Sequence, residues 1–365
     1  MPSTVIPFGD PKAAKKWSAS LAVDQAKKSY FERKFIGTDQ NSVIQRKTEL
    51  ETEAGDTISF DLSVQLRGEH TTGDSRLEGR EENLRFYTDQ VMIDQARKAV
   101  SAGGAMTRKR TVHNLRQIAR DRLGDYWSRF MDEMIFMYLS GARGINQDFL
   151  FPLGYAGHAS NSFQAPDAGH ILYGGDATSK ATITNADIMT RELIERATVK
   201  ATMLQAQDTE NANMVPVKMD GEERYVCLMS PFQEHDLRVS EGSGWLEIQK
   251  AAAAAEGRNN PIFKGSLGMI NNTVLHSHRN AIRFGDYGTG NNLPASRALF
   301  MGAQAGVVAY GTTGGMRFTW KEKMKDFDNE PAVASGAIFG MKKTRFNGRD
   351  FGVLSLDTYA ADPNA

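Results

Sequence analysis

The sequence predicts an α+β protein, because strand-like and helix-like patterns occupy separate stretches of the chain. In DTISFDLSVQL, residues 56–66, apolar and polar residues alternate, which is typical of a half-buried strand. From Thr111 to Leu139 the apolar residues instead recur every three or four positions, as on one face of a helix. At 365 residues the chain exceeds the size of a single core, so we expect at least two packed units.

The composition is that of a globular protein with balanced charge. Hydrophobic residues make up 40% of the chain and charged residues 24%, and 44 basic residues match 44 acidic ones. Proteins that bind nucleic acid through their charge carry a basic excess, so this class is disfavoured. Cys227 is the only cysteine, which excludes an internal disulfide and suits a reducing compartment. No apolar signal segment or 18-residue apolar stretch occurs, so we expect synthesis in a cytoplasm without secretion or membrane insertion.

Residues 1–50 form a polar segment in which apolar residues such as Trp17 and Phe35 are scattered. Such a segment buries little surface by itself, so we expect it to be mobile or laid over another surface. A neighbouring molecule is the surface that we expect to bury Trp17 and Phe35.

A long hairpin is expected between Asp56 and Ile93. Its second strand carries Leu84 and Phe86, and Val91 and Ile93 continue the alternation with changed parity, which predicts a bulge or break between them. The tip, RGEHTTGDSRLEGREE, is half charged and has almost no apolar residue, so it cannot fold back onto its own core. We expect it to pair charges on another subunit.

The helical pattern that ends at Leu139 is unusually long. Thr111 is a suitable N-cap residue and Gly141 a suitable C-terminal stop. Such a helix would extend roughly 45 Å, more than a compact domain needs. We therefore interpret it as a spine.

Shorter signals follow the spine. A second helix is expected to begin at Thr184 or Asn185, with Asp187 in its first turn. The Asp-Gly pair at 220–221 and the Asn-Gly pair at 347–348 each predict a hairpin. Further along, SGWLEIQKAAAAA predicts another helix, GDYGTGNN a mobile loop, and RALFMGAQAGVVAYG a buried strand.

The stretch NPIFKGSLGMINNTVLHSH, residues 260–278, holds the strongest candidates for chemistry. His276 and His278 would share one face of a strand, as in some metal sites, but no spaced third ligand accompanies them. Gly265 and Gly268 lack the Lys-Ser/Thr of a phosphate-binding loop. We interpret the stretch as a single strand.

Three other candidates have simpler structural explanations. Asp132 and Glu133 are adjacent on the spine and point in different directions, which suits an acid/base pair poorly. The methionines spaced along the spine helix are typical of packing. The basic run MKKTR, residues 341–345, is too short to bind DNA alone.

The order of these elements resembles the major capsid protein of tailed bacteriophages, the Hong Kong 97-type coat fold. A polar arm, the hairpin around DTISFDLSVQL, the helix from Thr111 to Leu139 and a terminal Asn-Gly hairpin follow one another as in that family. YVCLMSPFQEHDLR is similar to the family's strand and short helix, with Pro231 at the junction, and PIFKGSLGMINNTVLHS to its apolar strand. Within the family, the chain most resembles the coliphage N-four-like branch.

The resemblance implies four parts. Residues 1–50 would be the N-terminal arm, 51–100 the hairpin known as the E-loop, 101–180 with 300–365 the peripheral domain, and 181–299 the axial domain. The protein would not be an enzyme and would need no cofactor. It would build hexamers and pentamers of an icosahedral virion shell, assembled in the host bacterial cytoplasm. The expected partners are further copies, portal, scaffolding and decoration (cement) proteins, and packaged double-stranded DNA contacted weakly, with no membrane.

Two alternatives remain open on the residues alone: an encapsulin-type compartment with the same fold, and a metal-dependent enzyme built on His276 and His278. The shell hypothesis predicts contacts between copies through eight residues: Trp17, Phe35, Arg67, Glu69, Asp74, Arg76, Glu78 and Arg80. No lysine lies between Lys47 and Lys98, so the hairpin has no amine for an isopeptide cross-link, and we expect a non-covalent shell.

Overall fold

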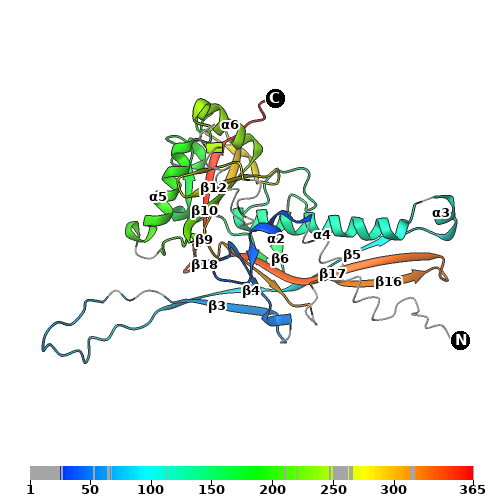
Figure 1. The fold of residues 1–365 in the computed structure, drawn as a ribbon, viewed down its shortest axis with the longest axis horizontal. Coiled ribbons are helices and arrows are strands. Elements are labelled where there is room, and N and C mark those ends of the chain that lie inside the picture. Colours follow the sequence, from blue (N-terminus) through cyan, green and yellow to red (C-terminus); the bar gives the residue numbers. More distant parts are fainter. Residues whose placement is uncertain are drawn as a thin grey trace.

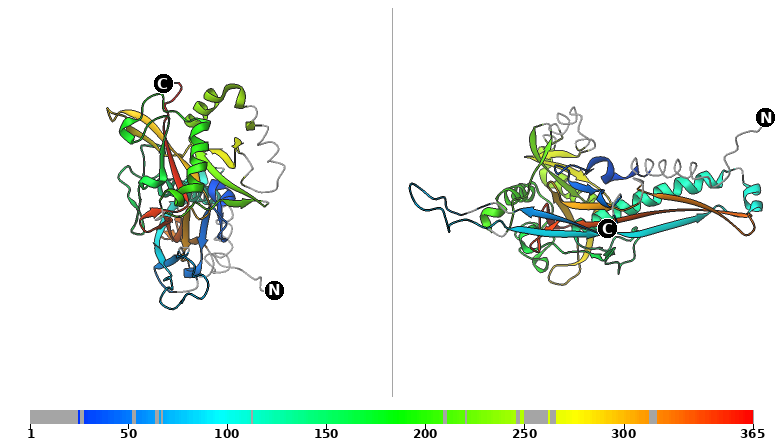
Figure 2. Two further views of the ribbon diagram at one scale, coloured as in Figure 1. Left: turned by 90° about the vertical axis from the view of Figure 1, so that its left-hand side faces the viewer. Right: turned by 90° about the horizontal axis from the view of Figure 1, so that it is seen from below.

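The computed structural model describes residues 25, 28–51, 54–63, 66, 68–111, 113–208, 211–219, 221–245, 248–249, 262, 266–312 and 317–364. Trp17, Arg67 and most of the helix expected at 243–255 lie outside this part of the chain. The subunit is elongated (Figure 1), with a hairpin at one end, a sheet covered by helices in the body, and a long helix beside long strands toward the other end. The two further views show the same elongation (Figure 2).

A six-stranded sheet forms the elongated half. Its strands are β1 (Ile36–Gly37), β2 (Ile44–Lys47), β5 (Asp94–Ser101), β15 (Gly306–Tyr310), β16 (Thr319–Lys325) and β17 (Glu330–Lys343). Residues 332–336 of β17 pair with both β5 and β16, and residues 339–343 pair with β15. Because β2 also pairs with β15, part of the segment expected to be an arm belongs to this sheet.

The spine helix α4 (Leu115–Ser140) lies along β17. Gly141 ends it in the left-handed conformation, as predicted. The predicted N-cap was wrong: Asn114 accepts a hydrogen bond from the Gln117 amide, while Thr111 follows a separate helix, α3 (Ala105–Arg110). Side-chain capping by Asn114 satisfies an amide that lacks a helical partner, so the helix begins there.

The second half of α4 is enclosed on all sides rather than on one face. Every residue from 131 to 140 is buried. Trp127, Met134 and Tyr138 belong to the main core, together with residues of β14, β15 and β17. The methionines of this helix therefore serve packing, as predicted from their spacing.

An eight-stranded sheet forms the body. Its strands are β8 (Ile171–Tyr173), β9 (Val217–Met219), β10 (Glu222–Met229), β11 (Gly268–Ile270), β12 (Thr273–Ser277), β13 (Arg283–Tyr287), β14 (Leu293–Met301) and β20 (Val353–Tyr359). The central order is β11-β12-β10-β14-β20-β8. The β9–β10 turn and a small hairpin of β18 (Arg345–Phe346) and β19 (Arg349–Asp350) confirm the two predicted Xaa-Gly turns.

Two strand expectations were wrong. The stretch 260–278 contains two antiparallel strands, β11 and β12, because Asn271 adopts a left-handed turn conformation between them. The run expected to be one strand is divided between β14 and β15, which belong to different sheets. In GDYGTGNN, expected to be a mobile loop, residues 285–287 belong to β13 and the rest forms the turn that leads into β14.

Two helices cover the eight-stranded sheet (Figure 1): α5 (Arg191–Gln207) and α6 (Pro231–Glu241). The expected start of α5 was wrong, because Thr190 caps it. Asp187 instead accepts hydrogen bonds from the amide and hydroxyl of Thr184 in the preceding turn. The predicted junction at Pro231 is confirmed, with Ser230 as N-cap.

The remaining elements are short. They are α2 (Tyr30–Lys34), β3 (Thr57–Ser63), β4 (Phe86–Met92), β6 (Gly157–His158), β7 (Asn161–Ser162) and four 3₁₀ turns at Glu49–Glu51, Ala168–His170, Lys180–Thr182 and Gly242–Gly244. Cys227 lies in the core beneath α5, where burial raises the pKa of its thiol to about 12. In the described ranges, no helix combines the length and apolarity needed to cross a membrane.

Candidate intersubunit surfaces

The projecting hairpin consists of β3 and β4, which pair without interruption from Thr57↔Met92 to Ser63↔Phe86. The predicted bulge is therefore wrong. Tyr87, Asp89 and Val91 alternate toward the subunit, whereas Phe86 is exposed on the opposite face. The apparent change of parity arises because Phe86, near the end of the hairpin, lies on the exposed face, whereas Val91 lies on the face that packs against the subunit.

The root of the hairpin is anchored to its own subunit. Ile58 and Val91 pack against Val307 of β15. Asp89, nearly buried, forms an ion pair with Lys342 and accepts a hydrogen bond from the Arg345 amide. The basic run at 341–345 thus serves an internal ion pair, which sequence reasoning did not foresee.

The tip of the hairpin carries both charged and apolar exposed residues. Arg76 and Glu78 pair with each other at 2.5 Å, and both are more than 70% exposed, so this contact contributes little. Glu69, Asp74 and Arg80 are also exposed. Within the tip, residues 67–82, Leu77 is the one large apolar residue, as expected, but Leu66, Leu84 and Phe86 beside the tip are also each about 60% exposed. A repeated apolar surface on a thin hairpin marks a contact that the isolated subunit does not make.

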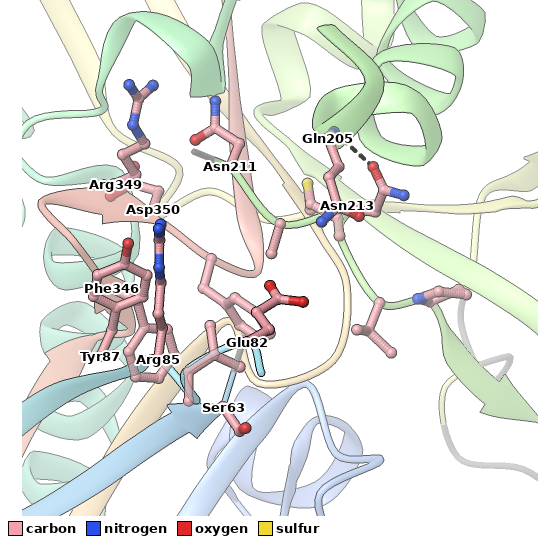
Figure 3. Close-up of a pocket in the computed structure, with 16 residues that line it drawn as sticks. Ser63, Glu82, Arg85, Tyr87, Gln205, Asn211, Asn213, Phe346, Arg349 and Asp350 are labelled. Carbon is pink, nitrogen blue, oxygen red and sulfur yellow. Dashed lines mark hydrogen bonds between the residues drawn. The ribbon is translucent and has the colours of Figure 1, made fainter. Parts of the chain in front are cut away.

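A cavity of about 520 Å³ separates the hairpin from the loop that follows α5 (Figure 3). Arg85 and Tyr87 line one side, and Asn213, whose Oδ1 accepts a hydrogen bond from the Gln205 amide, lines the other. Phe346 of β18 closes the left of the view. The hairpin is consequently held by β15 and β17–β18 and is separated by this cavity from the α5 side.

The segment expected to need a neighbour for burial is already packed. Phe35 is only 2% exposed, and its ring lies 5.7 Å from that of Phe31 and 5.4 Å from that of His276. The assignment of Phe35 to a contact between copies was therefore wrong. The periodicity of this polar segment gave no sign that its few aromatic residues gather in α2 and fill the end of the main core.

Asp132 of the spine holds α2 in place. Its carboxylate accepts hydrogen bonds from the Ser29 hydroxyl at 2.6 Å and from the amides of Tyr30 and Phe31 at 2.9 and 3.3 Å. Burial raises the pKa of this carboxyl to about 6. Asp132 therefore positions α2 against α4. Sequence reasoning considered Asp132 only together with Glu133 and did not foresee this role.

The two histidines singled out as metal ligands lie in an aromatic cluster. His276 is fully buried and its Nε2 lies 2.9 Å from the carbonyl oxygen of Ile262. His278 stacks on Phe136 at 5.1 Å and lies 4.6 Å from Tyr30. Across the described residues, no group of three or more His, Cys, Asp or Glu side chains is placed to hold a metal ion.

Burial also determines the protonation of these histidines. Burial, the largest cause, acts together with the nearby Lys34 ammonium to lower the pKa of His276 to about 3 and that of His278 to about 4. Arg279 contributes to the lowered pKa of His278. Both rings are neutral at physiological pH and pack as aromatic residues between α2 and β12.

A buried ion pair connects the spine to the eight-stranded sheet. Arg297 of β14 donates two hydrogen bonds of 2.6 Å to Asp357 of β20 and one of 2.7 Å to the Ser140 carbonyl at the end of α4. The Tyr287 hydroxyl donates to the same carboxylate at 2.6 Å. The neighbouring carboxylate raises the pKa of Arg297 despite its burial.

These features describe a subunit whose buried ion pair and anchoring carboxylate have their partners within the same chain, and whose projecting hairpin exposes apolar side chains that the chain does not cover. A projecting hairpin, a long enclosed helix beside long strands, and a second sheet covered by helices constitute the Hong Kong 97-type coat fold. The class of protein defined by this fold is the subunit of a closed protein shell.

Comparison with known proteins gives the family. Residues 5–362 match the phage capsid protein family, and the chain belongs to it. The major capsid protein of Pseudomonas phage KPP25 is 27% identical over 350 residues, which is 91% of each chain. The capsid of Ralstonia phage GP4 is 69% identical over the whole of both chains, with a TM-score of 0.89. The capsid of cyanophage Pam1 shares the fold, with 21% identity, 91% and 94% of the chains covered, and a TM-score of 0.69.

The function follows from the family. The protein is a major capsid protein of an icosahedral phage head, a structural component of the virion rather than an enzyme. Capsid assembly implies that its copies associate with one another. This outcome favours the coat protein over both alternatives, the encapsulin-type compartment and the metal-dependent enzyme.

Proposed function

We propose that copies of this coat protein form the hexamers and pentamers of the shell, with the hairpin of each copy laid over an adjacent copy. The observation that carries this proposal is the exposure of Leu66, Leu77, Leu84 and Phe86 on a hairpin that leaves its own subunit. A heterologous contact of this kind repeats around a ring until it closes. Many weak contacts then act together across the shell.

The exposed apolar residues, rather than the charges, should supply most of the hairpin's binding energy. Burying one large apolar side chain is worth about 1.5–3 kcal/mol, whereas an exposed ion pair is worth about 0–1 kcal/mol. The contacts first expected of Glu69, Asp74, Arg76, Glu78 and Arg80 would then set orientation at the rim. Arg67 and Trp17 lie outside the described residues, so they remain proposed contact residues on the basis of the sequence alone.

Deletion of residues 69–82 tests the hairpin contact. The subunit should keep its folded core, measured by circular dichroism, because the deleted residues lie beyond the β3–β4 ladder. Rings and shells should be lost in electron micrographs. A matched pair separates the two kinds of contact: Leu77→Ser with Leu84→Ser should reduce assembly strongly, and Arg76→Ala with Glu78→Ala only weakly. Normal shells from the deletion would contradict the proposal.

The four-part division and the branch are also proposals. We propose residues 1–50 as arm, 51–100 as E-loop, 101–180 with 300–365 as peripheral domain and 181–299 as axial domain. The two main hydrophobic cores support a division into two packed units, although β8 and β20 pair within the sheet that holds most of 181–299. The order of elements supports placement in the coliphage N-four-like branch. Superposition on that phage's coat subunit should then give a closer match than superposition on the Hong Kong 97 subunit.

Further partners are proposed on the same basis: portal, scaffolding and decoration proteins, and packaged double-stranded DNA bound weakly. The equal numbers of basic and acidic residues support weak DNA contact, because tight phosphate binding requires a basic excess. Purified free subunits should bind duplex DNA only at low salt. Retention of the DNA complex at physiological salt would contradict this expectation.

A further inference from the structure

A lysine and a carboxylate meet in the interior at the base of the β18–β19 hairpin. Lys343 is the last residue of β17 and Asp350 the last residue of β19, seven positions further along the chain. The Lys343 ammonium donates a hydrogen bond of 2.6 Å to Asp350 Oδ2. The Lys343 side chain is 2% exposed and the Asp350 side chain 0%, so both charged groups are shut off from bulk water.

Burial works against the charges of this pair. Removing two ions from water costs free energy that their mutual attraction offsets only in part. Burial is the largest cause of a lowered pKa of the Lys343 ammonium and of a raised pKa of the Asp350 carboxyl, although each partner acts in the opposite direction. Both shifts favour a neutral amine beside a neutral carboxylic acid. A desolvated neutral amine is a nucleophile, whereas an ammonium is not.

Two further contacts fix the Asp350 carboxyl in front of the amine. The Arg345 guanidinium lies 3.0 Å from Asp350 Oδ1, and the Asp350 amide donates a hydrogen bond of 3.0 Å to the Asp167 carboxylate. The carboxyl carbon is one bond from Oδ2, so the Lys343 nitrogen lies at most about 3.8 Å from it. That separation approaches the roughly 3–3.5 Å of a reacting pair, and the fixed geometry replaces a search in solution.

The Arg345 cation also suits the charge that an attack on Asp350 develops. When an amine adds to a carboxyl carbon, negative charge grows on the carboxyl oxygen, and a cation already in place stabilises it. Asp350 in addition lines the cavity of about 520 Å³ beside the projecting hairpin (Figure 3), which gives a released water molecule a way out of the interior. A nucleophile, an electrophile and a charge-stabilising group therefore lie together.

We propose that Lys343 and Asp350 condense into an isopeptide bond within each chain. The ammonium first gives a proton to the carboxylate, which leaves an amine and a carboxylic acid. The amine nitrogen then forms a bond to the Asp350 carboxyl carbon, and the bond from that carbon to its hydroxyl oxygen breaks. A proton from the nitrogen joins the departing hydroxyl. One amide and one water molecule result, and neither an oxidant nor a second copy is needed.

The bond reinforces the place where the projecting hairpin is anchored. Phe346, between the two joined residues, meets Phe60 of β3 with ring centroids 6.0 Å apart. Lys342, next to Lys343, forms an ion pair with Asp89 of β4. A covalent ring through residues 343–350 holds these contacts together, whatever the hairpin touches. Because both ends belong to one chain, copies stay unlinked and boiled shells still release single chains.

Intact-mass spectrometry of the unaltered protein tests the proposal without any variant. Denatured free subunits should weigh one water molecule less than the sequence requires, once N-terminal processing has been read from the terminal peptide. Trypsin cuts after Lys342, Arg345 and Arg349 but not after an acylated lysine, so it should release residues 343–345 joined to residues 350–365 as one branched peptide. The full sequence mass, with residues 350–365 recovered as a separate linear peptide, would overturn the proposal.

Two variants show whether these residues form the bond. Lys343→Arg keeps a positive charge but offers no neutral amine, and Asp350→Ala removes the carboxyl. Both chains should have the full mass of their sequences and yield only linear peptides. A mass deficit that persists in either variant would place the loss of water elsewhere in the chain and overturn the proposal.

An exposed pair in the same chain tests burial as the cause. Lys180 and Asp286 are 2.5 Å apart, but their side chains are 45% and 60% exposed. Water stabilises their charged forms, so no bond should form there and trypsin should cut after Lys180. A branched peptide that joins Lys180 to Asp286 would overturn the reasoning, because proximity alone would then suffice.

Discussion

Replacing Asp357 by alanine leaves Arg297 as a buried cation without its carboxylate. In the native subunit the Asp357 side chain is 1% exposed and the Arg297 side chain 8% exposed. The Asp357 carboxylate lies 2.6 Å from the Arg297 guanidinium. Removal of one partner from a buried ion pair typically costs about 3–5 kcal/mol. Since the whole free energy of unfolding of a domain is only about 5–15 kcal/mol, this single change should destabilise the subunit severely.

The double variant Arg297→Met with Asp357→Leu should be less harmful than the two single changes predict. Apolar replacement of both charges is itself nearly neutral, but it leaves the Tyr287 hydroxyl and the Ser140 carbonyl without partners. Each unsatisfied buried group costs about 1–3 kcal/mol. The double variant should therefore lose about 2–6 kcal/mol, below the roughly 6–10 kcal/mol sum of two single losses.

Urea denaturation of free subunits, followed by the fluorescence of the buried Trp127 and Trp320, measures these differences. Glu195→Ala is the control, because the Arg191–Glu195 pair on α5 is half exposed and should contribute less than about 0.5 kcal/mol. A loss below about 1 kcal/mol for Asp357→Ala, or additivity of the single losses in the double variant, would refute the reasoning.

Three further predictions follow from the arm, the histidines and the hairpin. The folded-state pKa values of His276 and His278 are depressed, so the neutral rings contribute their full stabilisation above pH 6.5. Free subunits should lose this stabilisation as the pH falls from 6.5 toward the folded-state pKa values of about 4 and 3. His276→Phe with His278→Phe should flatten that dependence in thermal melts, and an unchanged slope would exclude the histidines as its cause. Trypsin should spare residues 28–50 in free subunits, since α2 and β2 are packed; rapid cleavage there, seen by mass spectrometry, would contradict the structure. Shells boiled in detergent should run as one band near 40.3 kDa, because no lysine lies between Lys47 and Lys98, and a ladder of larger species would show cross-linking.

The coat fold was predictable because its largest features are local in sequence. The alternation through DTISFDLSVQL and the Xaa-Gly turns identified β3, the β9–β10 turn and the β18–β19 hairpin. Gly141 marked the end of the spine for a local reason, its left-handed conformation. Each of these signals depends on a few neighbouring residues, so tertiary packing did not alter them.

The errors arose where distant residues decide the structure. Phe35 lies in a polar segment and is buried by His276, more than two hundred positions away. Asp132 was considered only as a poor acid/base partner of Glu133, because its hydrogen-bond partners at α2 are about a hundred positions earlier. Val307 and Phe300 belong to one apolar run, yet pairing partners place them in different sheets. Periodicity describes which side of an element is apolar and does not identify what covers it.

The strand order of the body constrains when a subunit can form. β20 is the last strand of the chain to be synthesised, yet it lies between β14 and β8 inside the eight-stranded sheet. A growing chain therefore cannot complete that sheet until residue 359 has left the ribosome. Non-local pairing of this kind also folds slowly, since distant segments must meet before the sheet gains stability. We therefore expect a chain that lacks β20 to be unable to complete the body of the subunit.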